Sequence, residues 1–172
     1  MISITAARRA ALALALMGGL SGAALAEDEG ALAQFNSLKP DVALDLARGA
    51  LEACREAGYQ VAVAVVDRFG QTQVVLRDRF AGPHTVPTAS GKAWTAVSFR
   101  GATLELDRRL AEGELSPGLR RIPGALFLGG GLPVEAAGSI VGGIGISGAP
   151  DPQFDEDCAN AGLEAISDLL DF

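Results

Sequence analysis

The sequence predicts an α/β domain of the α+β type, in which helices flank a central antiparallel sheet. Helical periodicity near both ends of the folded region and two pairs of strand-like segments, each pair joined by a short turn, predict this class. Strands joined as hairpins favour an antiparallel sheet over alternating strand–helix units. The expected order is helix, strand, strand, helix, helix, strand, strand, helix.

Residues 1–26 have the pattern of a signal peptide. Arg8 and Arg9 precede a short apolar run, which ends in an A-x-A motif closing at Ala26. The apolar run is shorter than the ~20 residues of a membrane-spanning helix. We expect a periplasmic or secreted protein, cleaved near Ala26-Glu27; the alternatives are an uncleaved anchor or a buried helix.

The remaining chain has the length of about one domain. We expect a loose N-terminus over 27–39 and a single domain over 40–172. The formal net charge is −7, and removal of the two signal-peptide arginines makes the chain more acidic. An acidic chain without a basic cluster argues against nucleic-acid binding.

The first helix is predicted to begin at Pro40, because proline is favoured in a first helical turn, and to end at Gly58. Helical spacing gives it an apolar face. That face comprises Ala43, Leu46, Ala47, Ala50, Cys54 and Ala57.

A hairpin follows the first helix. Residues 60–67 are apolar on both faces, which predicts a central buried strand. A turn over 67–70 leads to a more polar strand over 71–78, expected nearer the sheet edge.

Two helices are expected next, over 87–99 and 102–111, with a proline-containing loop over 112–124. Residues 125–148 then predict a strand, a glycine-rich turn and a second strand. The last helix is expected over 155–170, where acidic residues in the first turn suit the helix dipole. The predicted apolar face of the helix over 87–99 comprises Ala89, Ala93, Ala96 and Val97, and that of the last helix Cys158, Ala161, Ala165 and Leu169.

The two cysteines, Cys54 and Cys158, each lie on the apolar face of a predicted helix. Two cysteines in an exported protein suggest one disulfide, and terminal helices packed on one face of the sheet could bring them together. The alternative is two separately buried thiols.

Several motifs argue against common enzyme classes. "GGGLP" at 129–133 lacks the GK[ST] ending of a phosphate loop. The glycines of "GGIGISG" lie inside an apolar strand, where glycine more often lets a backbone or a ligand come close. The sequence also lacks the G-x-S-x-G element that would indicate a hydrolase.

His84 is the single histidine and lies where a Gly-Pro turn meets a predicted helix. It is either a helix-entry residue without a special role or an axial ligand of haem iron, for which one imidazole can suffice. Neighbouring apolar side chains could cover a porphyrin, and neighbouring cations could pair with propionates. The apolar candidates are Phe80, Trp94 and Phe99, and the cationic ones are Arg77, Arg79 and Lys92.

Four stretches in order, from about Pro40 to Leu170, resemble the GlcG/HbpS-like haem-binding family. They are "VAVAVVDRFGQTQVVLRD", "GKAWTAVSFRGATLEL", "PGALFLGGGLPV" and "GSIVGGIGISGAPDPQFDEDCANAGLEAI". Within them stand the family's KA-x-TA element at 92–96, its GxIGxSG element at 143–148 and its acidic-Cys-Ala helix start at 155–159.

The resemblance implies a profilin-like domain, self-association into dimers or larger symmetric oligomers, and haem as ligand. Some exported members of the family are sensor partners of membrane kinases, and others accompany glycolate or diol metabolism. His84 is then the first candidate for the iron ligand, with Thr103 and Lys92 as second choices. Two alternatives remain: an enzyme acting on a small organic acid or alcohol-derived metabolite, with Lys92 or His84 as acid/base, and a ligand-free partner of a membrane complex.

Overall fold

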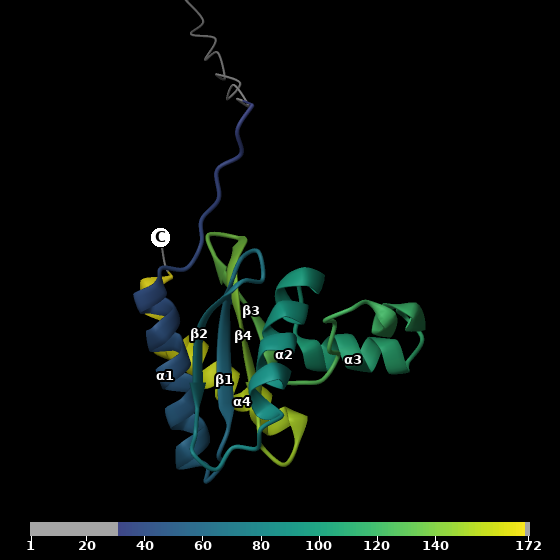
Figure 1. The fold of residues 1–172 in the computed structure, drawn as a ribbon. Helices are drawn as coiled ribbons and strands as arrows, with labels where there is room; N and C mark the ends of the chain where they lie inside the picture. Colours follow the sequence, from purple (N-terminus) through teal and green to yellow (C-terminus); the bar gives the residue numbers. More distant parts are fainter. Residues whose placement is uncertain (1–30, 171–172) are drawn as a thin grey trace, which may run out of the picture. The chain divides into compact units, whose positions relative to one another are not determined.

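The computed structural model describes residues 31–170, and their element order is the predicted one (Figure 1). Residues from Phe35 onward form one compact unit. The predicted signal peptide lies outside the described residues. The elements are α1 (Pro40–Glu56), β1 (Ala62–Asp67), β2 (Thr72–Arg77), α2 (Thr85–Phe99), α3 (Thr103–Ala111), β3 (Gly131–Ala136), β4 (Ser139–Ser147) and α4 (Pro152–Ala165), with short 3₁₀ turns at Pro117–Arg121 and Ser167–Leu169.

The four strands form one antiparallel sheet in the order β2-β1-β4-β3. The predictions of a central strand over 60–67 and of a strand nearer the edge over 71–78 are confirmed. β1 is buried along nearly its whole length because it is paired on both sides and covered on both faces. β2 has one strand neighbour and alternates between exposed and half-buried positions.

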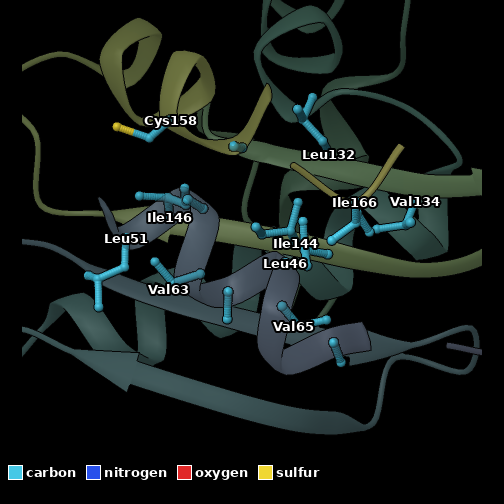
Figure 2. Close-up of a cluster of buried hydrophobic side chains, with 14 of the residues drawn as sticks. Leu46, Leu51, Val63, Val65, Leu132, Val134, Ile144, Ile146, Cys158 and Ile166 are labelled. Carbon is cyan, nitrogen blue, oxygen red and sulfur yellow. The ribbon is translucent and has the colours of Figure 1, made fainter. Parts of the chain in front are cut away.

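Alternate residues of β1 point to opposite faces of the sheet and meet different helices. Val63 and Val65 join the main core with α1 and α4 (Figure 2). Ala62 and Ala64 pack instead against Ala89 of α2. The sheet is therefore sandwiched between α1 and α4 on one face and α2 on the other.

Glycines in β4 allow α2 to lie directly on the sheet. A Cβ atom at Gly145 would be 2.1 Å from the carbonyl oxygen of Ala89, and one at Gly143 would be 3.0 Å from that of Ala93. The first contact excludes a side chain at Gly145, and the second leaves little room for one at Gly143. The glycine-rich motif thus serves the close approach of a backbone, one of the two roles expected for it.

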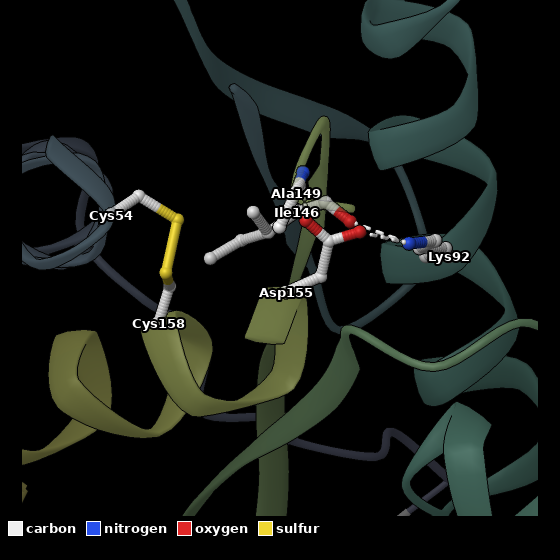
Figure 3. The surroundings of a disulfide bond; sticks show 6 residues. All are labelled: Cys54, Lys92, Ile146, Ala149, Asp155 and Cys158. Carbon is white, nitrogen blue, oxygen red and sulfur yellow. Dashed lines mark hydrogen bonds and ion pairs between the residues drawn. A yellow bond between two sulfur atoms is a disulfide. The ribbon is translucent and has the colours of Figure 1, made fainter. Parts of the chain in front are cut away.

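The predicted disulfide is confirmed. Cys54 of α1 and Cys158 of α4 are bonded, with their Cα atoms 5.4 Å apart (Figure 3). The two helices pack on the same face of the sheet, so their apolar faces bring the sulfur atoms together.

Several predicted boundaries are wrong by a few residues. α2 begins at Thr85, two residues before the expected Pro87. α4 begins at Pro152, because the Asp151 side chain caps it by accepting from the Gln153 amide, and it ends at Ala165. The hairpin between β3 and β4 turns at 137–138, and Gly129 lies before the first strand.

The predicted buried faces of the terminal helices also need correction. Ala57 lies just beyond the last turn of α1 and is exposed. Ala165 and Leu169 are exposed, because α4 ends at Ala165 and Leu169 lies in the 3₁₀ turn that follows. The residues of α4 that are buried are Asp155, Cys158, Ala159 and Gly162.

Within the described range, no helix is both long and apolar enough to cross a membrane.

Candidate functional site

The predicted site residues fall into two separate groups. One group lies on and beside the loop between β2 and α2, which is exposed at Arg77, Arg79, Phe80 and His84. The other lies on α2 and at the start of α3, where Lys92 and Thr103 are buried and Trp94 is half-buried.

His84 immediately precedes α2, and its side chain is exposed. Its carbonyl oxygen accepts from the amide and the hydroxyl of Thr88, at 3.1 and 2.8 Å, which fixes the first helical turn. The imidazole lies against Gly82, where a Cβ atom would be 2.7 Å from Cε1 and 2.9 Å from Nδ1. In residues 31–170 neither ring nitrogen of His84 forms a hydrogen bond, so the imidazole can offer a lone pair to a guest.

The residues preceding His84 build a firmly held loop. Arg77 donates from Nε to the carbonyl oxygen of Ala81 at 3.1 Å, so its guanidinium already holds the loop. Arg55 of α1 donates from Nε to Asp78 at 2.9 Å, and this carboxylate is buried. The loop is therefore anchored both to itself and to α1.

Beyond this anchor the loop presents an apolar and cationic tip. Phe80 is 80% exposed. The Arg79 guanidinium lies 5.9 Å from the centroid of that ring. Arg79 and Phe80 are therefore accessible from solvent.

Lys92 occupies a different place, in the interior between α2, β4 and α4 (Figure 3). It is 1% exposed, and its Nζ donates to the carbonyl oxygen of Ile146 and to Asp155 Oδ2, both at 2.8 Å. The other carboxylate oxygen of Asp155 accepts from the Ala149 amide at 3.0 Å. Two of the three N–H donors of the ammonium group are thus bonded inside this chain.

Burial sets the direction of the pKa shifts at this pair. It lowers the pKa of Lys92 and raises the pKa of Asp155, because both charged forms lose hydration. The attraction between the two opposite charges acts against burial at each group.

Thr103 is also engaged within the protein. Its hydroxyl donates to the carbonyl oxygen of Leu128 at 2.7 Å and accepts from the Gly131 amide at 2.8 Å. The side chain is fully buried and fixes the entry into β3.

Two of the three predicted aromatic neighbours, Trp94 and Phe99, are not brought to His84. Trp94 lies ten residues further along α2, which is about 15 Å of helix. Its ring packs against the β1–β2 turn, where a Cβ atom at Gly70 would be 2.6 Å from Cδ1. Phe99 packs on Phe127 with ring centroids 4.9 Å apart.

Asp155 and Glu156 are the site residues that sequence reasoning missed. The sequence explains both carboxylates by their favourable position in the first turn of a helix. No local pattern relates Asp155 to a lysine 63 positions earlier. Glu156 is half-buried and accepts from the Gly130 amide at 3.4 Å, and burial raises its pKa.

Comparison with known proteins adds a family to this geometry. Residues 38–164 match the model of a family described as haem-degrading, HbpS-like proteins. The protein in a crystal structure of HbpS is 47% identical in sequence to this chain, and the two folds superpose with a TM-score of 0.75. The match covers 80% of this chain and 95% of that HbpS chain. A crystal structure of a PduOC–haem complex is 30% identical and has a TM-score of 0.69, covering 76% of this chain and 95% of PduOC.

A curated relative is the corrinoid adenosyltransferase PduO of Salmonella typhimurium (strain LT2), 35% identical over 124 residues. The match covers 71% of this chain but only 37% of PduO. The chain thus spans about a third of the curated relative's length.

Proposed function

The chain belongs to the HbpS-like family of haem-degrading proteins, and from this premise we propose that it is an exported haem-binding protein whose β2–α2 loop holds the ligand. The observation that carries the proposal is the exposed imidazole of His84, with both ring nitrogens unengaged in the described chain. The structure of PduOC with haem supports this ligand class within the family's fold.

The loop residues fit a porphyrin chemically. The His84 nitrogen is a suitable axial ligand for haem iron. Phe80 offers an exposed ring to cover the macrocycle, and Arg79 offers a guanidinium to a propionate. Haem would supply an iron that accepts the imidazole lone pair, and His84, Phe80 and Arg79 would bind and orient it.

Titration of the purified apo protein with haemin tests this assignment. We expect a Soret band that is red-shifted from free haemin in the wild type, and at least a ten-fold weaker affinity with an altered band in His84→Ala. Arg121→Ala removes an exposed arginine far along the chain and is the matched control; it should behave as the wild type. An identical spectrum and affinity in His84→Ala would remove His84 from the role.

The same titration examines the second-choice ligands. Thr103 and Lys92 are buried and already hydrogen-bonded, so haem could reach them only after these contacts are broken. Thr103→Val is therefore expected to leave the haem spectrum unchanged. A loss of the Soret shift in this variant, with His84→Ala unaffected, would move the iron site to α3.

The enzyme alternative gains one observation, the carboxylate of Asp155 beside Lys92. An acid/base pair must reach its substrate, however, and this one is buried, with both groups hydrogen-bonded inside the chain. Binding is therefore better supported than turnover.

Export and self-association complete the proposal. The Cys54–Cys158 bond suits an oxidising compartment, and N-terminal sequencing of the exported protein should begin at Glu27. Association into dimers or larger oligomers, and with a membrane sensor or complex, belongs to the same proposal. Light scattering with and without haemin measures the first, and co-purification from membranes measures the second.

A further inference from the structure

A polar groove lies at the end of the sheet where three chain reversals meet. The β1–β2 turn, the β3–β4 turn and the C-terminal end of α2 converge there (Figure 1). The groove has a volume of about 340 Å³. Its polar lining comprises Arg68, Arg100, Glu135 and Ser139, and Val97 and Ile140 add apolar surface.

Arg68 is held in position before any ligand arrives. Its guanidinium carbon lies 4.4 Å from the ring centroid of Phe35 and 5.7 Å from that of Phe69. Nη1 donates to the carbonyl oxygen of Asn36 at 3.3 Å. These contacts reduce the entropy that the side chain would lose on binding an anion.

Arg100 reaches the groove from a strained backbone position. It caps α2 with a φ of 54°, in the left-handed region that normally favours glycine. The next residue is Gly101. A helix one residue longer would therefore have its left-handed cap at a glycine instead of at Arg100. Backbone strain of this kind clusters at functional sites, where the surrounding structure maintains it.

The two arginines of the groove form no ion pair with the carboxylate beside them. Across residues 31–170, neither Arg68 nor Arg100 has a carboxylate oxygen within 4.0 Å, although Glu135 lines the same groove. Two guanidinium groups facing one carboxylate leave a net positive site. Guanidinium groups bind carboxylates through paired, parallel hydrogen bonds.

From this geometry we propose that the groove is a binding site for a small organic carboxylate. Arg68 and Arg100 hold carboxylate oxygens of the ligand, and the Ser139 hydroxyl donates to a further ligand oxygen. Val97 and Ile140 contact its carbon atoms.

This site is distinct from the proposed haem site. His84 precedes the first turn of α2 and Arg100 follows the last, and the 15 residues between them rise about 22 Å. A porphyrin bound through iron at His84 cannot place its propionates at Arg100 of the same chain.

An NMR titration of the apo protein with sodium succinate, at constant ionic strength, tests the proposal. We expect saturable shifts of the Gly138 and Ser139 amides, and none with the neutral analogue succinamide. Arg68→Gln and Arg100→Asn should each weaken binding at least ten-fold, whereas Arg48→Gln, an exposed arginine on α1, should not change it. Asparagine is chosen at position 100 because it tolerates the left-handed conformation.

Arg100→Lys keeps the charge without the paired donors and should bind with intermediate affinity. Unsaturable shifts, equal binding to all variants, or equal shifts with succinamide would overturn the carboxylate site. Haemin affinity should be unchanged in Arg100→Asn, and a parallel loss of haem and succinate binding would overturn the separation of the two sites.

Discussion

At the scale of single residues, the pair formed by Lys92 and Asp155 is the main ionic contact in the described interior. It ties α2 to α4, and the lysine also reaches the Ile146 carbonyl at the end of β4. A buried ion pair adds little over a well-packed apolar pair, but removal of one partner leaves an uncompensated charge. The pair therefore specifies how three elements meet more than it adds net stability.

We expect Lys92→Met to lower the free energy of unfolding by about 3–5 kcal/mol, because Asp155 would stay buried without its partner. The double variant Lys92→Met/Asp155→Leu should recover much of this loss. Arg108→Ala breaks exposed ion pairs on α3 and is the control, with an expected loss below about 1 kcal/mol. Urea unfolding measures all three, and a loss in Lys92→Met no larger than in Arg108→Ala would contradict the argument.

Glu156 should make stability depend on pH. Burial raises its folded-state pKa, so the folded protein binds the proton more tightly than the unfolded chain. The stability linked to this group is present below its ordinary pKa of 4.5 and is lost as pH rises through the raised value. Glu156→Gln removes this loss and should gain stability relative to the wild type between pH 4 and pH 7. Thermal unfolding at both pH values checks this, and a constant difference would exclude the linkage.

At the scale of elements, the β3–β4 hairpin shows a residue poorly matched to its turn. Ala137 and Gly138 form a two-residue connection with φ values of 48° and 72°, the pattern of a type I′ turn. Asparagine and glycine suit the first of these positions better than alanine does.

Ala137→Asn should therefore raise the free energy of unfolding by about 0.5–1 kcal/mol. Ala137→Val, which is β-branched, should lower it and serves as the opposite control. Melting temperatures give both signs, and destabilisation by asparagine would show that the alanine side chain makes a contact that matters more than the turn conformation.

The packing of α2 on β4 was visible in the sequence only in part. Glycines within an apolar strand indicated a close approach, and the small residues of 87–99 predicted the face of a helix. The sequence could not decide which segment approaches, because a glycine indicates room for a close contact but not the identity of its neighbour. The structure places Ala89 and Ala93 of α2 there.

At the scale of the whole molecule, the disulfide joins the first and last helices across a separation of 104 residues. Closing so long a loop restricts the unfolded chain more than the folded one. The double variant Cys54→Ala/Cys158→Ala should lose about 4–5 kcal/mol in the chain-entropy model. Guanidinium unfolding measures this, and reduction of the wild type should reproduce the same loss. A change below about 1 kcal/mol would show that packing of α1 on α4 already restricts the chain.

The candidate site was predicted less well than the fold. His84, Arg79 and Phe80 are consecutive or nearly so, and their exposure followed from a loop between a strand and a helix. Lys92, Trp94 and Thr103 were grouped with them through sequence proximity or family resemblance. A helix carries each residue 1.5 Å along its axis and turns it by about 100°, so neighbours in sequence reach different surroundings.

The sequence by itself determined the element order, the antiparallel sheet and the central and edge strands, because periodicity and turn residues act over a few positions. It suggested a bond between Cys54 and Cys158 but left two separate thiols as the alternative, and the structure decided for the bond. Only the tertiary structure decided that Lys92 meets Asp155, that Thr103 supports β3 and that Arg68 and Arg100 share a groove. The first two contacts join residues 63 and 28 positions apart, and the groove is formed by segments that are distant in sequence. These contacts depend on how the helices pack on the sheet, and no local sequence pattern specifies that packing.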